Sequence, residues 1–129
     1  MEQGKDVTIT GIDHINIGTT RLAETVAFFR DVLGLSVGAR PNFPFPGAWL
    51  YSGETAVVHL VELGHSKGPS SESALDHFAF RISDYDDIVA RLTAADMEFT
   101  AFDVPGTTTR QIFVRDMNGV SIELNYRPA

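Results

Sequence analysis

The sequence predicts an α+β fold in which two βαβββ modules form a curved mixed sheet around a metal cavity. Two observations predict it. The seven residues that begin at Gly11 return in similar form 63 residues later, so that Asp13-His14 recurs as Asp76-His77. His59 lies in an apolar run 64 residues before Glu123, which lies in a similar run. Such a repeat indicates two copies of one unit, neither of which could bury one face of its sheet alone.

The first module is expected at about residues 7–63. Its predicted elements are a strand, a helix and two later strands, at 7–18, 21–33, 48–51 and 54–62. The helix follows from apolar residues at helical spacing, with Gly34 as a natural C-terminal cap. Between helix and strands, the aromatic segment 41–47 contains too many prolines for a helix or a central strand.

The second module is expected at about residues 73–126 and repeats this order. A strand over 75–82 precedes a helix that Ser83 and Asp86 would cap as a capping box. Three strands follow, around 97–103, 109–115 and 119–126. An Asn-Gly turn separates the last two, which is a strong hairpin signal. At 129 residues, the two modules fit a single domain, 1–129.

Composition excludes several classes of function. The 43% apolar and 21% charged residues are typical of a soluble globular protein. The net charge is −7 and the chain has no basic stripe, so nucleic acid is not an expected partner. No apolar run approaches a membrane span or a signal peptide, so a cytoplasmic protein without a membrane partner is expected. The chain has no cysteine, so a bound metal would need nitrogen and oxygen ligands.

Strand alternation predicts which side chains share a face of the sheet. The metal-ligand types in the repeat all point away from the large apolar residues that alternate with them; these are His14, His59, His77 and Glu123. Burying a carboxylate and three imidazoles together without a cation would be costly. We therefore expect these four to bind one divalent metal ion. Nitrogen and oxygen ligands suit Fe, Mn, Co, Ni or Zn, and the sequence does not choose among them.

The chain resembles the vicinal oxygen chelate superfamily, which includes glyoxalase, bleomycin resistance and dioxygenase families. The likeness rests on four segments: Asp13-His14, Phe28 to Leu35, Asp76-His77, and Phe113 to Leu124. It implies that His14, His77 and Glu123 are the shared ligands, with His59 at the fourth, glyoxalase-type position.

Two departures from that pattern bear on the reaction. Glyoxalase I usually has glutamate at the position of His59, and the epimerases have glutamine. Glyoxalase I also tends to have an arginine where this chain has Gly18, which argues against glutathione as co-substrate.

Counting coordination positions separates the possible reactions. Four protein ligands leave two positions in an octahedron, enough for one chelating substrate. This favours a glyoxalase-like lyase or isomerase that shuttles a proton, with Glu123 and His59 as catalytic groups. If His59 does not coordinate the metal, a third coordination position is available. An Fe(II)-dependent extradiol dioxygenase is then the alternative. A non-catalytic, resistance-type binder of small molecules is the other alternative.

Five further residues are expected to bind the small-molecule substrate. They are Asn16, Phe43, Phe45, Trp49 and Arg110. Asn16 shares the face of His14, Arg110 is near Glu123, and the aromatic residues lie in an irregular segment typical of substrate loops. The alternative for that segment is a hydrophobic plug over the end of the sheet. A homodimer is expected, because small sheets of this kind benefit from covered edges.

Overall fold

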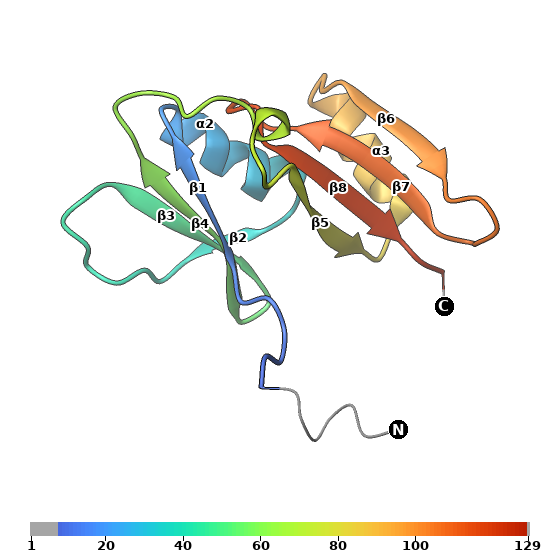
Figure 1. Ribbon diagram of the computed structural model, residues 1–129, viewed down its shortest axis with the longest axis horizontal. Helices are drawn as coiled ribbons and strands as arrows, with labels where there is room; N and C mark the ends of the chain where they lie inside the picture. The colour runs from blue at the N-terminus through green and yellow to red at the C-terminus, as the bar shows by residue number, and fades with distance from the viewer. Residues whose placement is uncertain (1–7, 129) are drawn as a thin grey trace.

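The computed structural model describes residues 8–128, and it contains two four-stranded mixed sheets. The first sheet has the order β1-β4-β3-β2, with strands Ile15–Thr19, Thr55–Glu62, Gly47–Ser52 and Ser36–Gly38. The second has the order β5-β8-β7-β6, with strands His77–Ile82, Ser121–Tyr126, Arg110–Arg115 and Phe99–Asp103. Figure 1 shows the sheets next to each other. The predicted fold class and the two βαβββ modules are confirmed, and β2 is a strand of the first module that none of the predicted elements covers.

The eight strands form two sheets rather than one continuous sheet. The first strand of each module pairs with only one other strand. It runs parallel to the last strand of the same module, β1 beside β4 and β5 beside β8. Among the described residues, no ladder joins β1 to β5, so both remain edge strands. The two modules instead meet through their helices and loops.

The first predicted helix is present but changes its hydrogen bonding midway. Residues Leu22–Ala27 form the α-helix α2, and Phe28–Val32 continue it as the π-helix η1. Gly34 follows with a φ of 83°, as expected for the residue after a helix. The second helix, α3, spans Tyr85–Ala94. Its cap is Asp84 rather than Ser83, because the Asp84 carboxylate accepts the backbone N–H of Asp87 at 3.0 Å. A short 3₁₀ helix, η2, spans Ser70–Glu72.

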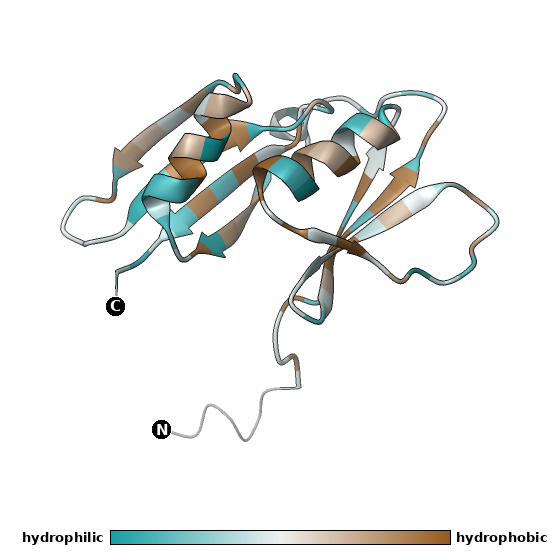
Figure 2. Ribbon diagram, turned by 180° about the vertical axis from the view of Figure 1, so that it is seen from behind, coloured by the Kyte–Doolittle hydropathy of each residue, from teal (hydrophilic) through white to brown (hydrophobic). Residues whose placement is uncertain are grey.

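The predicted alternation of the strands is confirmed by burial. The residues that flank the ligand candidates along the strands are fully buried or nearly so. Among them are Val58, Leu60, Ile122 and Leu124. They pack with Phe29 of η1 and Leu92 of α3 in one core cluster that extends through both modules. Figure 2, coloured by hydropathy, shows both helices on the same side of the sheets. The opposite faces of the sheets are therefore free to present polar groups.

A polar network fixes the second module to the first. Asn118, in the turn between β7 and β8, accepts the Thr19 hydroxyl at 2.6 Å and donates to the Thr25 hydroxyl at 3.1 Å. The buried Asp116 carboxylate holds the Asn118 side chain at 3.0 Å and also accepts the backbone N–H of Val120. The network joins the end of β1, α2 and the last hairpin, and it sets how the two modules are placed. None of the helices in the described residues is long and apolar enough to cross a membrane.

Candidate metal centre

In the first module, three aromatic rings form a stack on the open face of the sheet. Trp49 and His59 are paired across β3 and β4, and their ring centroids are 3.9 Å apart with an angle of 11° between the planes. His14, just before β1, stacks on the other side of His59 at 3.7 Å and 11°. The stack holds the two imidazoles parallel, with the indole behind them.

The hydrogen bonds of these imidazoles decide which nitrogens are free. His14 Nδ1 is 2.7 Å from the Asp13 carboxylate, which leaves Nε2 free. His59 Nε2 donates to the carbonyl oxygen of Ala56 at 3.1 Å, which leaves Nδ1 free. Burial and the neighbouring His14 lower the pKa of His59, which favours its neutral form. Because in-plane lone pairs of parallel rings do not converge, His14 and His59 in this arrangement would not share one ion.

In the second module, a histidine and a carboxylate face each other directly. His77 Nε2 lies 3.3 Å from Glu123 Oε1, and His77 Nδ1 lies 2.9 Å from the Asp76 carboxylate. The other oxygen of Glu123 accepts hydrogen bonds from Gln111 at 3.1 Å and from Asn125 at 2.7 Å. A carboxylate behind an imidazole and amides behind a carboxylate are the usual supports of metal ligands. Nε2 and Oε1 are thus placed to bind a cation between them.

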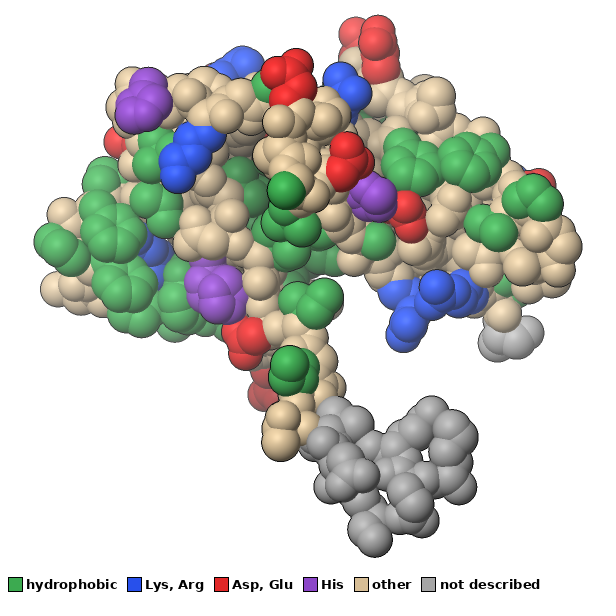
Figure 3. Space-filling model, in the orientation of Figure 1, with side chains coloured by type: hydrophobic (Ala, Val, Ile, Leu, Met, Phe, Trp, Pro, Cys, Tyr) green, Lys and Arg blue, Asp and Glu red, His purple; other side chains and the backbone are tan. Residues whose placement is uncertain are grey.

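The four predicted ligands form two pairs that do not meet within one chain. His14 and His59 belong to the first sheet, whereas His77 and Glu123 belong to the second. Residues 8–128 contain no group of three or more His, Asp or Glu side chains that could hold a metal ion. Figure 3 likewise shows histidine side chains at separate places on this face of the molecule. A single chain therefore provides two half-sites, not the enclosed cavity expected from the sequence.

The aromatic candidates of the substrate loop lie at the surface of the first module. Phe43 and Phe45 stack on each other at 5.2 Å, and each is 41% exposed. The Arg40 guanidinium lies 5.1 Å and 5.2 Å from the two ring centroids and donates to the Phe45 carbonyl oxygen. Asn16 is exposed and is paired in register with His59, on the same face. Of the predicted substrate-binding residues of the first module, Trp49 contacts the imidazole stack directly and Asn16 lies next to His59 in the sheet.

Arg110 is not near Glu123, contrary to expectation. It alternates with Gln111 along β7 and therefore lies on the face that the helices cover. There it forms an ion pair with Asp103 at 3.1 Å and lies 3.7 Å from the centroid of the Tyr85 ring. Its partners give Arg110 a role in holding α3, and the candidate substrate site excludes it.

Sequence reasoning missed the groups that support the ligands. Asp13 and Asp76 each directly precede a ligand histidine in the repeat, so their recurrence was an available signal. Gln111 and Asn125 lie on the face of Glu123, and strand alternation together with the β7–β8 hairpin could have identified them.

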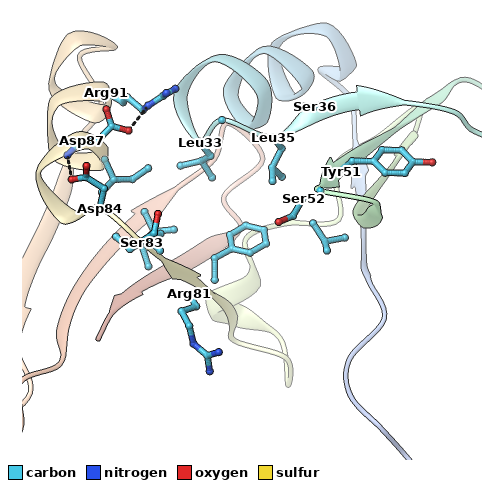
Figure 4. Close-up of a pocket in the computed structure, with 17 residues that line it drawn as sticks. Leu33, Leu35, Ser36, Tyr51, Ser52, Arg81, Ser83, Asp84, Asp87 and Arg91 are labelled. Carbon is cyan, nitrogen blue, oxygen red and sulfur yellow. Dashed lines mark hydrogen bonds and ion pairs between the residues drawn. The ribbon is translucent and has the colours of Figure 1, made fainter. Parts of the chain in front are cut away.

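A cavity of about 520 Å³ lies between the modules, away from both half-sites. It is bordered by the end of η1, the β3–β4 turn and the start of α3, and it includes Leu35, Ser52, Asp84 and Arg91 (Figure 4). The Arg91 guanidinium crosses between the modules, because it bonds Asp87 of α3 and reaches the backbone oxygen of Asp31 at 3.4 Å. This cavity contains no pair of metal-ligand side chains of the kind seen at His77 and Glu123.

Two curated relatives match part of the chain. The metallothiol transferase FosB of Staphylococcus haemolyticus is 30% identical over 82 residues, which cover 60% of this chain and 53% of FosB. The glutathione transferase FosA of Serratia marcescens is 28% identical over 78 residues, with the same coverage. The chain thus spans about half the length of the curated relatives that it matches.

Solved structures match the fold over nearly the whole chain. The fosfomycin resistance protein FosX of Listeria monocytogenes has a TM-score of 0.75 at 18% identity, covering 94% of this chain and 96% of FosX. A glyoxylase/bleomycin resistance protein/dioxygenase domain from Frankia has a TM-score of 0.78 at 18% identity, covering 94% of each chain.

One protein family matches the sequence from the first half-site to the last strand. A sequence model of that family matches residues 11–124, which include both Asp-His repeats, His59 and Glu123. The chain belongs to the Glyoxalase/Bleomycin resistance protein/Dioxygenase superfamily.

Proposed function

We propose that this protein is a metal-dependent enzyme whose site is completed by two chains of a homodimer. His77 and Glu123 of one chain would bind the metal together with His14 of the other. The observation that supports this most is the 3.3 Å approach of His77 Nε2 to Glu123 Oε1, with supporting hydrogen bonds behind both groups. Two protein ligands alone would leave the ion weakly held, so a third ligand from a second chain fits the need.

Exposed apolar side chains beside both half-sites support the dimer. Ile12, two residues before His14, is 88% exposed, and Leu75, two residues before His77, is 70% exposed. Apolar surface next to a polar site is typical of a face that a partner covers. In a two-fold dimer, the first-module half-site of one chain would face the second-module half-site of the other chain. The dimer would therefore contain two equivalent sites.

The donor set fits a divalent cation, because imidazole nitrogen and carboxylate oxygen suit Mn, Fe, Co, Ni and Zn. A bound divalent metal would supply Lewis acidity to two adjacent oxygens of a small substrate. Gln111 and Asn125 orient the Glu123 carboxylate through its other oxygen, so Oε1 would bind the metal and, on leaving it, accept or return a proton. This favours a glyoxalase-like lyase or isomerase that moves a proton on the carbon next to those oxygens.

His59 would have a role different from that of His14. Its ring is stacked on the face of the His14 ring, so it would orient His14. Its free Nδ1 would face the substrate and act as a base. A rotation of the ring about its side-chain torsions would turn it into the fourth ligand. The first arrangement leaves three open coordination positions, and the second leaves two.

A second candidate function comes from the curated relatives. FosA and FosB are named as a glutathione transferase and a metallothiol transferase. One FosX structure, a variant, is a complex with Mn(II) and 1S,2S-dihydroxypropylphosphonic acid, which has two adjacent hydroxyl groups. Transfer of a thiol to fosfomycin, or its hydration, would use the same two half-sites.

The experiment that tests the proposal measures metal content and then compares three assays. The protein loaded with Mn(II) would be given 2-oxoaldehyde–thiol adducts without oxygen, fosfomycin with glutathione or cysteine, and catechol with oxygen. Turnover of the adducts alone supports the lyase, turnover of fosfomycin supports the transferase, and oxygen uptake supports a dioxygenase. His65, an exposed loop histidine, provides the control variant His65→Ala, which should retain metal and activity. Failure of the wild-type protein to retain metal would contradict the whole proposal.

A further inference from the structure

Three rows of side chains cross the open face of the second sheet. The register of β5, β8 and β7 aligns them as His77–Ser121–Arg115, Ala79–Glu123–Phe113 and Arg81–Asn125–Gln111. Alternate residues of a strand are about 6.6 Å apart, and neighbouring strands are about 4.8 Å apart. Arg81 therefore lies one row beyond Glu123, with the two Cα atoms about 8 Å apart. A ligand held at Glu123 would extend toward Arg81.

Arg81 is an exposed arginine without a carboxylate partner in residues 8–128, where it forms no ion pair and no side-chain hydrogen bond. Of the other arginines of this module, Arg91 is paired with Asp87 and Arg110 with Asp103, whereas Arg115 also forms no ion pair in residues 8–128. Arg81 is among the residues that border the cavity between the modules, and Figure 4 shows its side chain pointing away from the other labelled residues. A chain with a net charge of −7 has many carboxylates, so an unpaired guanidinium on the ligand-bearing face is notable.

Asn125, next to Arg81 in the same row, has a side-chain oxygen that lacks a hydrogen-bond partner. Its Nδ2 donates to Glu123, but its Oδ1 is buried and has no hydrogen-bond partner. A buried acceptor without a donor is costly, and it often marks the place of a group that binds there. The guanidinium of Arg81 could donate to this oxygen and in doing so would turn toward Glu123. The same oxygen could accept a hydroxyl group of a bound ligand.

We propose that Arg81, positioned by Asn125, binds an oxyanion of the substrate whose adjacent oxygens lie at the metal. The inference rests on the proposed function and adds the substrate class: a small molecule with two vicinal oxygens and a carboxylate or phosphonate group. A guanidinium forms paired hydrogen bonds with either group, so both are compatible with the site. The row spacing requires the anionic group to be only a few bonds from the vicinal oxygens.

Arg115 is the matched comparison for Arg81. It is also exposed, lies on the same face and is diagonal to Glu123 on the opposite side. However, the depression that it shares with His77 is also lined by Asp76 and Glu98, whose carboxylates would repel an anion. Arg115→Gln therefore removes the same charge at the same spacing, without removing the proposed anion contact.

The test measures binding of three ligands to the Mn(II)-loaded protein by calorimetry. Catechol is neutral, whereas 3,4-dihydroxybenzoate and 3,4-dihydroxyphenylphosphonate add a carboxylate or a phosphonate to the same vicinal oxygens. The wild-type protein should bind at least one of the anionic ligands about tenfold more tightly than catechol, as expected of a charge-assisted hydrogen bond. The stronger of the two identifies the oxyanion. Arg81→Gln should lose this preference while retaining its affinity for catechol, Arg81→Lys should recover part of it, and Arg115→Gln should keep it.

An equal affinity of the wild-type protein for all three ligands would overturn the inference, as would loss of the preference in Arg115→Gln but not in Arg81→Gln. If the metal-loaded protein binds none of the three ligands, chelation of vicinal oxygens at the metal is contradicted, and a second measurement decides the anion site separately. That measurement follows the arginine Nε–H signals of the metal-free protein by NMR during titration with acetate and with methylphosphonate. A saturating shift of the Arg81 signal, with the Arg30 signal unchanged, supports the inference, and an unresponsive Arg81 signal overturns it.

Discussion

The two modules place different groups at equivalent positions of one repeat. Trp49 and His59 pair across β3 and β4 of the first module, and Phe113 and Glu123 pair in the same way across β7 and β8 of the second. In the first module His14, the predicted ligand, stacks on His59. In the second, His77 faces a carboxylate, and the ring of Phe113 meets its edge.

This difference makes the modules complementary rather than redundant. One half-site is aromatic and rich in imidazole, with a lowered pKa at His59. The other provides an anionic oxygen, supported by two amides. Two copies of the first half-site would give four imidazoles. Two copies of the second would give two imidazoles and two carboxylates. One of each gives three imidazoles and one carboxylate, which are the four ligands predicted from the sequence.

The largest expected effect is at the second module. His77→Ala should abolish retention of the metal, because it removes a ligand and leaves the Glu123 carboxylate without its partner. Metal content after dialysis, measured by elemental analysis, checks this. Stoichiometric metal in the His77→Ala protein would mean that the second module is not the anchoring half.

Removing the connection between the modules should have the next largest effect. Asn118→Ala deletes hydrogen bonds to Thr19, Thr25 and Asp116 and leaves the buried Asp116 carboxylate with fewer donors. The expected loss is about 1–3 kcal/mol in the free energy of unfolding, measured with urea. Thr107→Ala, in an exposed turn, is the control and should change stability much less. Equal losses in both variants would contradict the role of the network.

A smaller effect is expected when His59 is changed. His59→Gln removes a base and shortens the imidazole stack, but a glutamine could still contact the metal. Retained metal with retained proton-transfer activity would support His59 as a ligand. Oxygen uptake with catechol by the wild-type protein, lost in His59→Gln, would instead support a base next to a dioxygenase centre.

The smallest effect is expected in the aromatic loop of the first module. Phe45→Ala should weaken substrate binding and leave the metal content and melting temperature nearly unchanged, because the ring is 41% exposed and packs mainly on Phe43 and Arg40. Calorimetric binding and thermal melts check both parts. A large fall in melting temperature would show that the segment is a hydrophobic plug.

The repeat and the strand alternation were sufficient to predict the fold class. They placed Val58, Leu60, Ile122 and Leu124 in the core and their neighbours on the open face, because a period of two leaves only two choices of face. The same rule, applied to Ile112 and Val114, would have placed Arg110 on the helix side. That prediction failed because Arg110 was assigned by closeness in sequence and not by alternation.

Other features depend on contacts between distant residues. The network around Asn118 joins side chains that are 93 and 99 residues apart, and no local pattern in the sequence indicates the π-helical turn at η1. The separation of the ligands into two pairs follows from two sheets that share no ladder. The sequence predicts a homodimer, but it does not indicate whether each site is completed within one chain or across two.

The central claim, that each site takes His14 from one chain and His77 with Glu123 from the other, can be tested by mixing two variants. His14→Ala and Glu123→Ala are each expected to lack a complete site. After unfolding and refolding together in equal amounts, half of the dimers would contain one of each chain, and each of these would hold one intact site of two. The mixture should regain about one quarter of the wild-type metal content and activity. If it remains as inactive as the separate variants, the site does not form between chains and the account is wrong.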